Sequence, residues 1–419
     1  MIGTFRSLSH YNYRVWASGA LVSNIGTWMQ RTAQDWLVLT QLTHNNATAV
    51  GIVMALQFGP HLLLLPFTGF AADHFDRRKL LMCTQALMGS LALGLGVLTL
   101  LGYVQLWHVY IFAFLLGCAS AFDSPARQTF VSDLVDETNL SNAVGLNSTS
   151  FNSARMIGPA VAGLLISTVG TGAVFVINAV SYLAVIGSLS CLRINELYIT
   201  ARVDKVRGNL LEGFQYVWKR PDLKTILVML FLIGTFGLNF PIFISTMSVT
   251  VFHVGAHQFG FLMSAMAVGT VAGALLSARR DKPNRRHLLI AASVFGVGLS
   301  LAAVMPNYWL FGTLLILIGI SAQTFTTTAN STIQLSTSPT MRGRVMAIYL
   351  SIVLGCTPIG APLIGWVADT YGPRWGLIVG ALSGFSAAIV GIRYLIKYRN
   401  LRLRFQAGVP RFSMDEAIV

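Results

Sequence analysis

Apolar residues run along this chain in long blocks that are separated by short polar breaks. Blocks of about 20 apolar residues have the length that an α-helix needs to cross a hydrocarbon layer about 30 Å thick. Because the interior of a bilayer cannot satisfy a bare backbone, such blocks are expected to be helical. The pattern predicts twelve spans, at residues 15–40, 48–71, 80–101, 107–128, 142–167, 172–192, 224–250, 258–278, 288–305, 309–333, 344–368 and 375–396.

Composition agrees with a membrane protein. Only 11% of the residues are charged and 54% are hydrophobic, whereas soluble proteins carry roughly 25% charge. The net charge of +14 could point to nucleic acid, but its distribution does not. With a cytoplasmic N-terminus, all but three of the 29 lysines and arginines lie on the cytoplasmic side, the exceptions being Arg31, Arg155 and Arg374. This bias predicts that both termini are cytoplasmic. It also indicates that the chain is embedded in a lipid bilayer and does not bind nucleic acid.

The chain carries an internal repeat at half its length. Residues Ile157–Gly170 align without a gap with Ile359–Gly372, with identities that include three glycines, Gly158, Gly163 and Gly170. Such similarity is typical of a duplicated membrane bundle. We therefore expect an all-α integral membrane fold of twelve helices in two pseudo-symmetric six-helix bundles. Its parts are a first bundle (1–192), a cytoplasmic linker with an amphipathic helix (193–223), a second bundle (224–398) and a basic cytoplasmic tail (399–419).

The first predicted span is unusually polar on one side. Asn24, Trp28, Arg31 and Asp35 follow the spacing i, i+4, i+7 and i+11, which places them on one helical face. Ionised groups are expensive in lipid, so this face should meet a wet cavity or partner helices. Two interpretations stay open: a functional site in a cavity, or a structural pair between Arg31 and Asp35, which lie one turn apart.

The fifth span has a similar face and a break. Ser148, Asn152 and Arg155 lie on one side of the predicted helix, and Gly158 and Pro159 follow. Proline removes a backbone hydrogen bond and glycine allows helices to approach closely, so the pair predicts a hinge or, alternatively, a passive kink.

The second half offers neutral amides in place of charges. Asn239 lies in the seventh span, and the tenth span carries Gln323, Thr327, Asn330 and Gln334 on one face. These side chains, together with Asn24, Trp28, Ser148 and Asn152, are predicted to line a substrate cavity. Hydrogen bonding between helices is the alternative for the amides.

The segment GFAADHFDRRKLL between the second and third spans resembles the loop signature of the major facilitator superfamily. Gly69, Asp73, Arg77 and Arg78 match that pattern. The resemblance implies contacts that stabilise one closed face of a two-state bundle. We expect Asp123 and Arg127, one turn apart in AFDSPARQTFVSDLV, to lock the cytoplasmic end in the same way; contact with substrate is the alternative.

Together with NLSNAVGLNSTSFNSARMIGPAVAGLL, the segment around Asp123 resembles the branch of that superfamily that contains bacterial siderophore exporters of the enterobactin-exporter type. An arginine common in the fourth span of the superfamily is replaced by Ala113. The resemblance implies a proton-coupled exporter of a small molecule in the bacterial inner membrane, working by alternating access. Asp35 would carry the proton, and Arg31 and Arg155 would modulate its charge.

Protons are the only coupling partner that this resemblance implies; no cofactor, metal or obligatory protein partner is expected. The alternatives are a multidrug efflux antiporter, or a lysophospholipid flippase or importer of the same fold. An enzyme is not expected, because the sequence has no convincing nucleophile triad, phosphate-binding loop or cluster of metal ligands.

Overall fold

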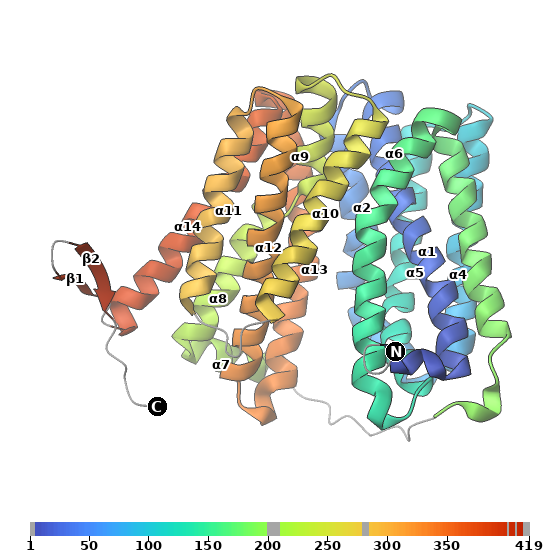
Figure 1. The fold of residues 1–419 in the computed structure, drawn as a ribbon, viewed down its shortest axis with the longest axis horizontal. Helices are drawn as coiled ribbons and strands as arrows, with labels where there is room; N and C mark the ends of the chain where they lie inside the picture. Colours follow the sequence, from blue (N-terminus) through green and yellow to red (C-terminus); the bar gives the residue numbers. More distant parts are fainter. Residues whose placement is uncertain (1–4, 199–209, 279–284, 400–401, 407–408, 414–419) are drawn as a thin grey trace.

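The computed structural model describes residues 5–198, 210–278, 285–399, 402–406 and 409–413. Nearly all of them are helical (Figure 1). The helices are α1 (Tyr11–Trp36), α2 (Ala47–Leu63), α3 (Leu65–His74), α4 (Arg77–Leu100), α5 (Leu106–Asp133), α6 (Glu137–Ser190), α7 (Leu210–Lys219), α8 (Pro221–Leu232), α9 (Phe240–Thr246), α10 (Ala256–Ala278), α11 (Arg285–Val304), α12 (Tyr308–Ser336), α13 (Pro339–Tyr371) and α14 (Pro373–Arg399).

Short elements connect or follow these helices. They are 3-10 turns at Arg6–Ser9 and Ile194–Glu196, and π-helical turns at Leu37–Leu42, Ile233–Gly237 and Met247–Val251. Two strands, β1 (Arg402–Gln406) and β2 (Val409–Ser413), pair antiparallel after α14. This pair is the described part of the predicted tail; the remaining tail residues, 400–401, 407–408 and 414–419, lie outside the described residues.

In the described part of the chain, nine helical segments are long and apolar enough to cross a membrane. The longest, α6, has 54 residues and is broken at Gly170, which has φ 84° and ψ 168°. Gly372, its partner in the sequence repeat, has φ 101° and ψ 157° at the end of α13. A positive φ favours glycine over residues with a Cβ atom. The repeat in sequence is therefore also a repeat in backbone geometry.

The helices gather in two groups (Figure 1). In the first group α1 and α4 pack against α6, and in the second α10 packs against α12 and α11 against α14. The groups meet where α2 contacts α13 and α6 contacts α10. The first helical turn, Arg6–Ser9, and the end of α14 lie toward one face of the molecule, which we call the termini face, and the opposite side is the far face (Figure 1).

Two glycines of the repeat make the contacts between the groups possible. A Cβ atom on Gly163 of α6 would lie 2.6 Å from the carbonyl oxygen of Ala256 in α10. A Cβ atom on Gly365 of α13 would lie 2.5 Å from the carbonyl oxygen of Ala47 in α2. Gly163 lies shortly before the break of α6 at Gly170, and Gly365 lies shortly before the end of α13 at Tyr371. Backbones can therefore touch there only because side chains are missing.

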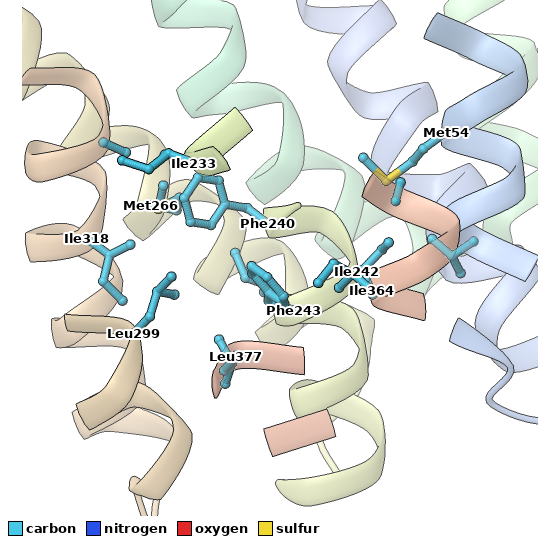
Figure 2. Packing of buried hydrophobic residues seen from close by; sticks show 14 of the residues in the cluster. Met54, Ile233, Phe240, Ile242, Phe243, Met266, Leu299, Ile318, Ile364 and Leu377 are labelled. Atoms are coloured by element: carbon cyan, nitrogen blue, oxygen red, sulfur yellow. The ribbon is translucent and has the colours of Figure 1, made fainter. Parts of the chain in front are cut away.

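The predicted span at 224–250 lies within one membrane-length segment, Pro221–Val251, but the helix in it is interrupted. A π-helical turn, Ile233–Gly237, follows α8, and α9 begins only at Phe240. The carbonyl oxygen of Thr235 occupies the place that a Cβ atom on Gly360 of α13 would need. Figure 2 shows Phe240 and Phe243 packed among side chains of neighbouring helices, such as Leu299, Ile318 and Leu377. Dense packing thus holds an irregular backbone segment beside the centre of the protein.

The amphipathic helix predicted in the linker coincides with α7. Its Glu212 pairs with Arg344 of α13 at 3.1 Å, so α7 is attached to the second group of helices. Phe214 and Trp218 of α7 are exposed. Residues 199–209 of the predicted linker lie outside the described residues.

Candidate functional site

A cavity of about 170 Å³ lies between the two groups of helices. The first group contributes side chains from α1, α2 and α6, and the second contributes α9, α10, α13 and the break before α9. The lining residues are Trp28, Arg31, Thr32, Asp35, Met54, Gln57, Phe58, Arg155, Pro159, Leu238, Phe240, Pro241, Met263, Met266, Ala267 and Thr357. Because both groups build it, any change in their relative position changes the cavity.

Two arginines of this lining share one aromatic ring. The Cζ atom of Arg31 lies 5.0 Å from the ring centroid of Trp28 and 5.2 Å from that of Phe58. The Cζ atom of Arg155 lies 5.5 Å from the same Trp28 ring. Trp28 and Arg31 are three residues apart on α1 and so project to the same side. The face predicted from the sequence of α1 is therefore brought together with Arg155 of α6.

Asp35 is the acid of the cavity lining, and its side chain is buried, with 7% exposure. Asp35 and Arg31 are one turn apart, yet the two side chains form no ion pair within 4.0 Å. The Nε atom of Arg31 is buried and has no hydrogen-bond partner in the part of the chain that the structure describes. The structural pair that the sequence left open is thus not formed, and both groups face the cavity.

Several lining residues could not be singled out from the sequence. Met54 and Phe58 come from α2, and Met263 and Met266 come from α10. Gln57 of α2 also lines the cavity, and its buried Nε2 atom has no partner among the described residues. An apolar residue in an apolar helix gives no signal that separates a cavity wall from a lipid contact. Gln57, a lone amide in an otherwise apolar helix, was the one signal available.

Other residues predicted to line the cavity lie elsewhere. Asn24 is on α1, 3.5 Å from a guanidinium nitrogen of Arg127. Asn152 donates to the backbone oxygen of Ser148 on its own helix, 2.8 Å away. Asn239 is fully buried at the break before α9 and donates to the backbone oxygen of Thr235 at 2.7 Å.

The amides of α12 satisfy one another along their own helix. Gln323 donates to the hydroxyl of Thr327 at 3.0 Å, and Gln334 donates to the side-chain oxygen of Asn330 at 2.9 Å. These four residues are absent from the cavity lining. The four side chains are half-buried or exposed, so the polar stripe of α12 did not predict the wall of this cavity.

The predicted lock residues pair within the first group of helices. Arg77 forms an ion pair with Asp133 at 2.7 Å, and the Nε atom of Arg78 donates to the backbone oxygen of Leu189 at 2.7 Å. These contacts tie the ends of α4, α5 and α6 together on the termini face. The surroundings of Gly69 and the side chain of Asp73 lie outside what the structure describes.

Asp123 and Arg127 form a buried network in the same group. Asp123 accepts hydrogen bonds from Thr84 at 2.8 Å and Gln85 at 2.7 Å, and it pairs with Arg127 at 2.9 Å. Each charge therefore has a partner, as burial requires. The network holds α4 against α5, and its hydrogen bonds join residues of the first group of helices.

The predicted hinge is a site of close packing. The helix continues through Gly158 and Pro159, and the non-helical residue of α6 is Gly170. A Cβ atom on Gly158 would lie 2.6 Å from the Cβ atom of Trp28. The carbonyl oxygen of Pro159 contacts Gly260 of α10. Gly158 and Gly260 therefore let α6 pack directly against α1 and α10.

Asp369 joins the two groups on the far face. Its carboxylate accepts hydrogen bonds from the backbone nitrogens of Ala47 at 2.6 Å and Thr48 at 2.8 Å, and from the Thr48 hydroxyl at 2.5 Å. The first turn of a helix presents free N–H groups and a partial positive charge, so a carboxylate there is stabilising. The α13 helix thus caps α2 across the boundary between the groups.

Replacing Asp369 with asparagine is expected to loosen this far-face contact. An amide keeps one acceptor oxygen and loses the charge that favours the helix N-terminus. Exposed charge–helix interactions of this kind are worth about 0.3–1 kcal/mol. The ratio of molecules with a closed far face to molecules with an open far face should therefore fall by up to about fivefold. Spin-label distances across the far face would measure the shift. A Thr48→Val variant, which removes only the hydroxyl, should have a smaller effect; equal distance distributions for Asp369→Asn and the parent would contradict the prediction.

Comparisons with known proteins agree with this architecture. A family model described as transmembrane secretion effector matches residues 2–408. The staphyloferrin A transporter of Staphylococcus aureus is 28% identical over 400 residues, which cover 93% of this chain and 97% of the relative. The multidrug efflux pump Tap of Mycolicibacterium fortuitum is 25% identical over 398 residues, 92% and 95% of the two chains.

A further relative is macrolide efflux protein A of Streptococcus pyogenes, 25% identical over 386 residues, or 88% of this chain and 92% of the relative. Among solved structures, a bacterial homologue of the human lysosomal transporter Spinster, in an inward-facing and occupied conformation, superposes with a TM-score of 0.71 at 14% identity, covering 95% of this chain and 98% of that one. At this identity the likeness concerns the fold.

Proposed function

The chain belongs to the transmembrane secretion effector family of the major facilitator superfamily, and from that premise we propose that it exports a small molecule across the bacterial inner membrane by alternating access, driven by protons. The proposal includes twelve spans, of which α6 supplies two on either side of Gly170. It places the termini face in the cytoplasm, as the distribution of lysine and arginine favours. The far face then points outward, and the contacts between the groups close it.

One observation carries this proposal. The cavity contains the ionisable side chains Arg31, Asp35 and Arg155, and both groups of helices wall it. Intramembrane ionisable residues that face a cavity are functional candidates, because lipid exposure would be costly. Midplane sites between repeats are the usual place for substrate and coupling ion in transporters of this kind. A rocking movement of the two groups would expose this site to each side in turn.

Asp35 is the proposed proton carrier, because it is the acid of the cavity lining. It would take up a proton from outside after the cargo has left and release that proton inside. The charge of Arg31, one turn away, and that of Arg155 would modulate this exchange. A single ionisable group is sufficient for a one-to-one cycle.

The proposed cargo is a siderophore-type molecule. The relative with 28% identity is named as a siderophore transporter, and the segments from α5 and α6 resemble the same branch. Efflux of several unrelated drugs is the second candidate, since relatives with 25% identity are named as multidrug and macrolide exporters.

The test uses purified protein in liposomes of known sidedness with an imposed proton gradient. With the termini face outside and an acidic lumen, candidate siderophores should accumulate inside the vesicles. Accumulation of a cationic dye alone would move the assignment to multidrug efflux. Accumulation only in the opposite orientation, or movement of labelled lysophospholipid alone, would overturn export in favour of import or lipid flipping.

A further inference from the structure

We infer that the cargo is an anion with an aromatic or apolar body, bound through its negative groups by Arg31 and Arg155 beside Trp28. This inference rests on the proposed transport function and specifies its substrate class. Its basis is the balance of charge in the cavity and the apolar character of the rest of the lining.

The side chains that line the cavity carry an excess of positive charge. Its ionisable residues are two arginines and one acid, so the wall carries a net positive charge even when Asp35 is ionised. Neither guanidinium group forms an ion pair in the described part of the chain, and the Nε atom of Arg31 has no hydrogen-bond partner there. Paired buried charges are the rule in proteins, as Asp123 and Arg127 illustrate in the neighbouring network.

Contacts with aromatic rings offset only part of the free-energy cost of burying the two arginines. Cation–π contacts of Arg31 and Arg155 with Trp28 and Phe58 are worth roughly 0.5–2 kcal/mol each. Removing an ion from water costs several kcal/mol even after relaxation. The rings therefore orient the guanidinium groups and reduce the cost, but they do not neutralise the charge. An anion that bridges the two arginines would supply what is missing, through charge-assisted hydrogen bonds.

The remaining wall of the cavity is largely apolar. Phe240 and three methionines, Met54, Met263 and Met266, face the same space. Methionine is flexible and polarisable and adapts to irregular apolar ligands. The aromatic rings that flank the guanidinium groups offer flat apolar surface next to the positive charge. A ligand that fits both parts has carboxylates or similar groups on one side and a ring or apolar group on the other.

A cationic cargo is disfavoured by the same geometry. A cation near Trp28 would meet two guanidinium groups already placed at its ring, and one carboxylate would have to offset both. The direction of transport favours an anion as well. With the interior negative, outward movement of one negative charge gains about 2.3 kcal/mol per 100 mV, and inward movement of a proton gains the same.

Calorimetric titration of the full-length protein in nanodiscs tests the inference. The probes share one aromatic ring: benzene-1,3-dicarboxylate as the anion, phenyltrimethylammonium as the cation and benzamide as the neutral compound. The dicarboxylate should bind most tightly. Arg155→Gln should weaken its binding about tenfold or more, because a hydrogen bond to a charged group contributes roughly 1.5–3 kcal/mol. Arg155→Lys, which keeps the charge, should lose less.

Matched variants separate charge from folding. Arg393→Gln removes an equal charge from an exposed position of α14 and should leave the dicarboxylate affinity unchanged. Arg31→Gln is a second cavity variant in case Arg155→Gln does not fold. Tighter binding of phenyltrimethylammonium than of the dicarboxylate would overturn the inference. So would a dicarboxylate affinity that stays within twofold in both cavity variants, or a parent protein that does not bind the dicarboxylate below 10 mM.

The binding measurement tests the anion site and the transport measurement tests the exporter, so one proposal can be overturned while the other stands. If the dicarboxylate binds through the arginines but no siderophore crosses the membrane with the proton gradient, the anion site stands and the proposed exporter falls. If export is driven by the gradient but the cargo that moves is a cation, and its movement survives Arg155→Gln, the exporter stands and the anion site falls.

Discussion

Replacing Asp35 with asparagine is expected to abolish accumulation of cargo against its gradient while leaving cargo binding intact. Asparagine has nearly the same shape but cannot take up or release a proton, and Asp35 is the acid of the cavity lining. In a one-to-one exchange with the membrane potential held at zero, a gradient of one pH unit supports about tenfold accumulation, since one pK unit corresponds to about 1.4 kcal/mol. The variant should reach equal concentrations on both sides.

Proteoliposomes with an acidic lumen provide the measurement, and binding is followed in parallel with the aromatic dicarboxylate. Removal of the Asp35 charge takes away the negative charge of the cavity lining, so the affinity for an anion should not decrease. Glu196→Gln removes a carboxylate from the surface of the termini face, where the side chain is about half exposed, and should transport like the parent. Undiminished gradient-driven accumulation in Asp35→Asn would remove Asp35 from the coupling mechanism.

The central charges of this site could be predicted from sequence because the bilayer leaves few places for an ionised group. In α1, the spacing of Trp28, Arg31 and Asp35 set one helical face, and the high cost of charge in lipid directed that face inward. The same reasoning identified Arg155. The partners of these groups were not predictable in this way: a pair one turn apart is compatible with a helix, yet Arg31 turns to Trp28 and Phe58 instead of Asp35.

The wall contributed by the second group of helices was predicted less well, and the reason is chemical. Amides such as Gln323 and Asn330 can be satisfied by a neighbour one turn away, so their stripe does not require a cavity. Met263 and Met266 line the cavity, but in an apolar helix they look like lipid-facing residues. The break before α9 lies among Gly234, Gly237 and Pro241, residues that permit an irregular backbone without specifying it.

The repeat was more informative than any single motif. Alignment of the two halves paired Gly170 with Gly372, and both adopt a positive φ at corresponding helix ends. It also paired Gly163 with Gly365, and both let a backbone of the opposite group approach. Glycine is favoured at the first pair by the positive φ and at the second pair by the close approach of a neighbouring backbone. The second pair allows the two groups of helices to touch.

Replacing Gly163 with alanine is expected to force the far face open. The added Cβ atom would lie 2.6 Å from the carbonyl oxygen of Ala256 and 3.1 Å from the Cα atom of Gly260. Both are backbone atoms of α10, so no side chain can rotate away and the helices must separate. Overpacking of this kind typically costs about 1–3 kcal/mol, which corresponds to a loss of roughly 5- to 150-fold in the closed-to-open ratio on the far face.

Gly145→Ala is the matched control, because it adds the same methyl group to the same helix at a position where, apart from the helix's own backbone, no atom lies within 4 Å. Spin-label distances between α6 and α10 on the far face should lengthen in Gly163→Ala and stay unchanged in Gly145→Ala. Export should slow only in Gly163→Ala. A carrier that cannot close its far face loses the state in which its cavity opens to the cytoplasm and collects cargo. Identical distances in the two variants would show that α10 yields locally and that the glycine contact does not govern closure.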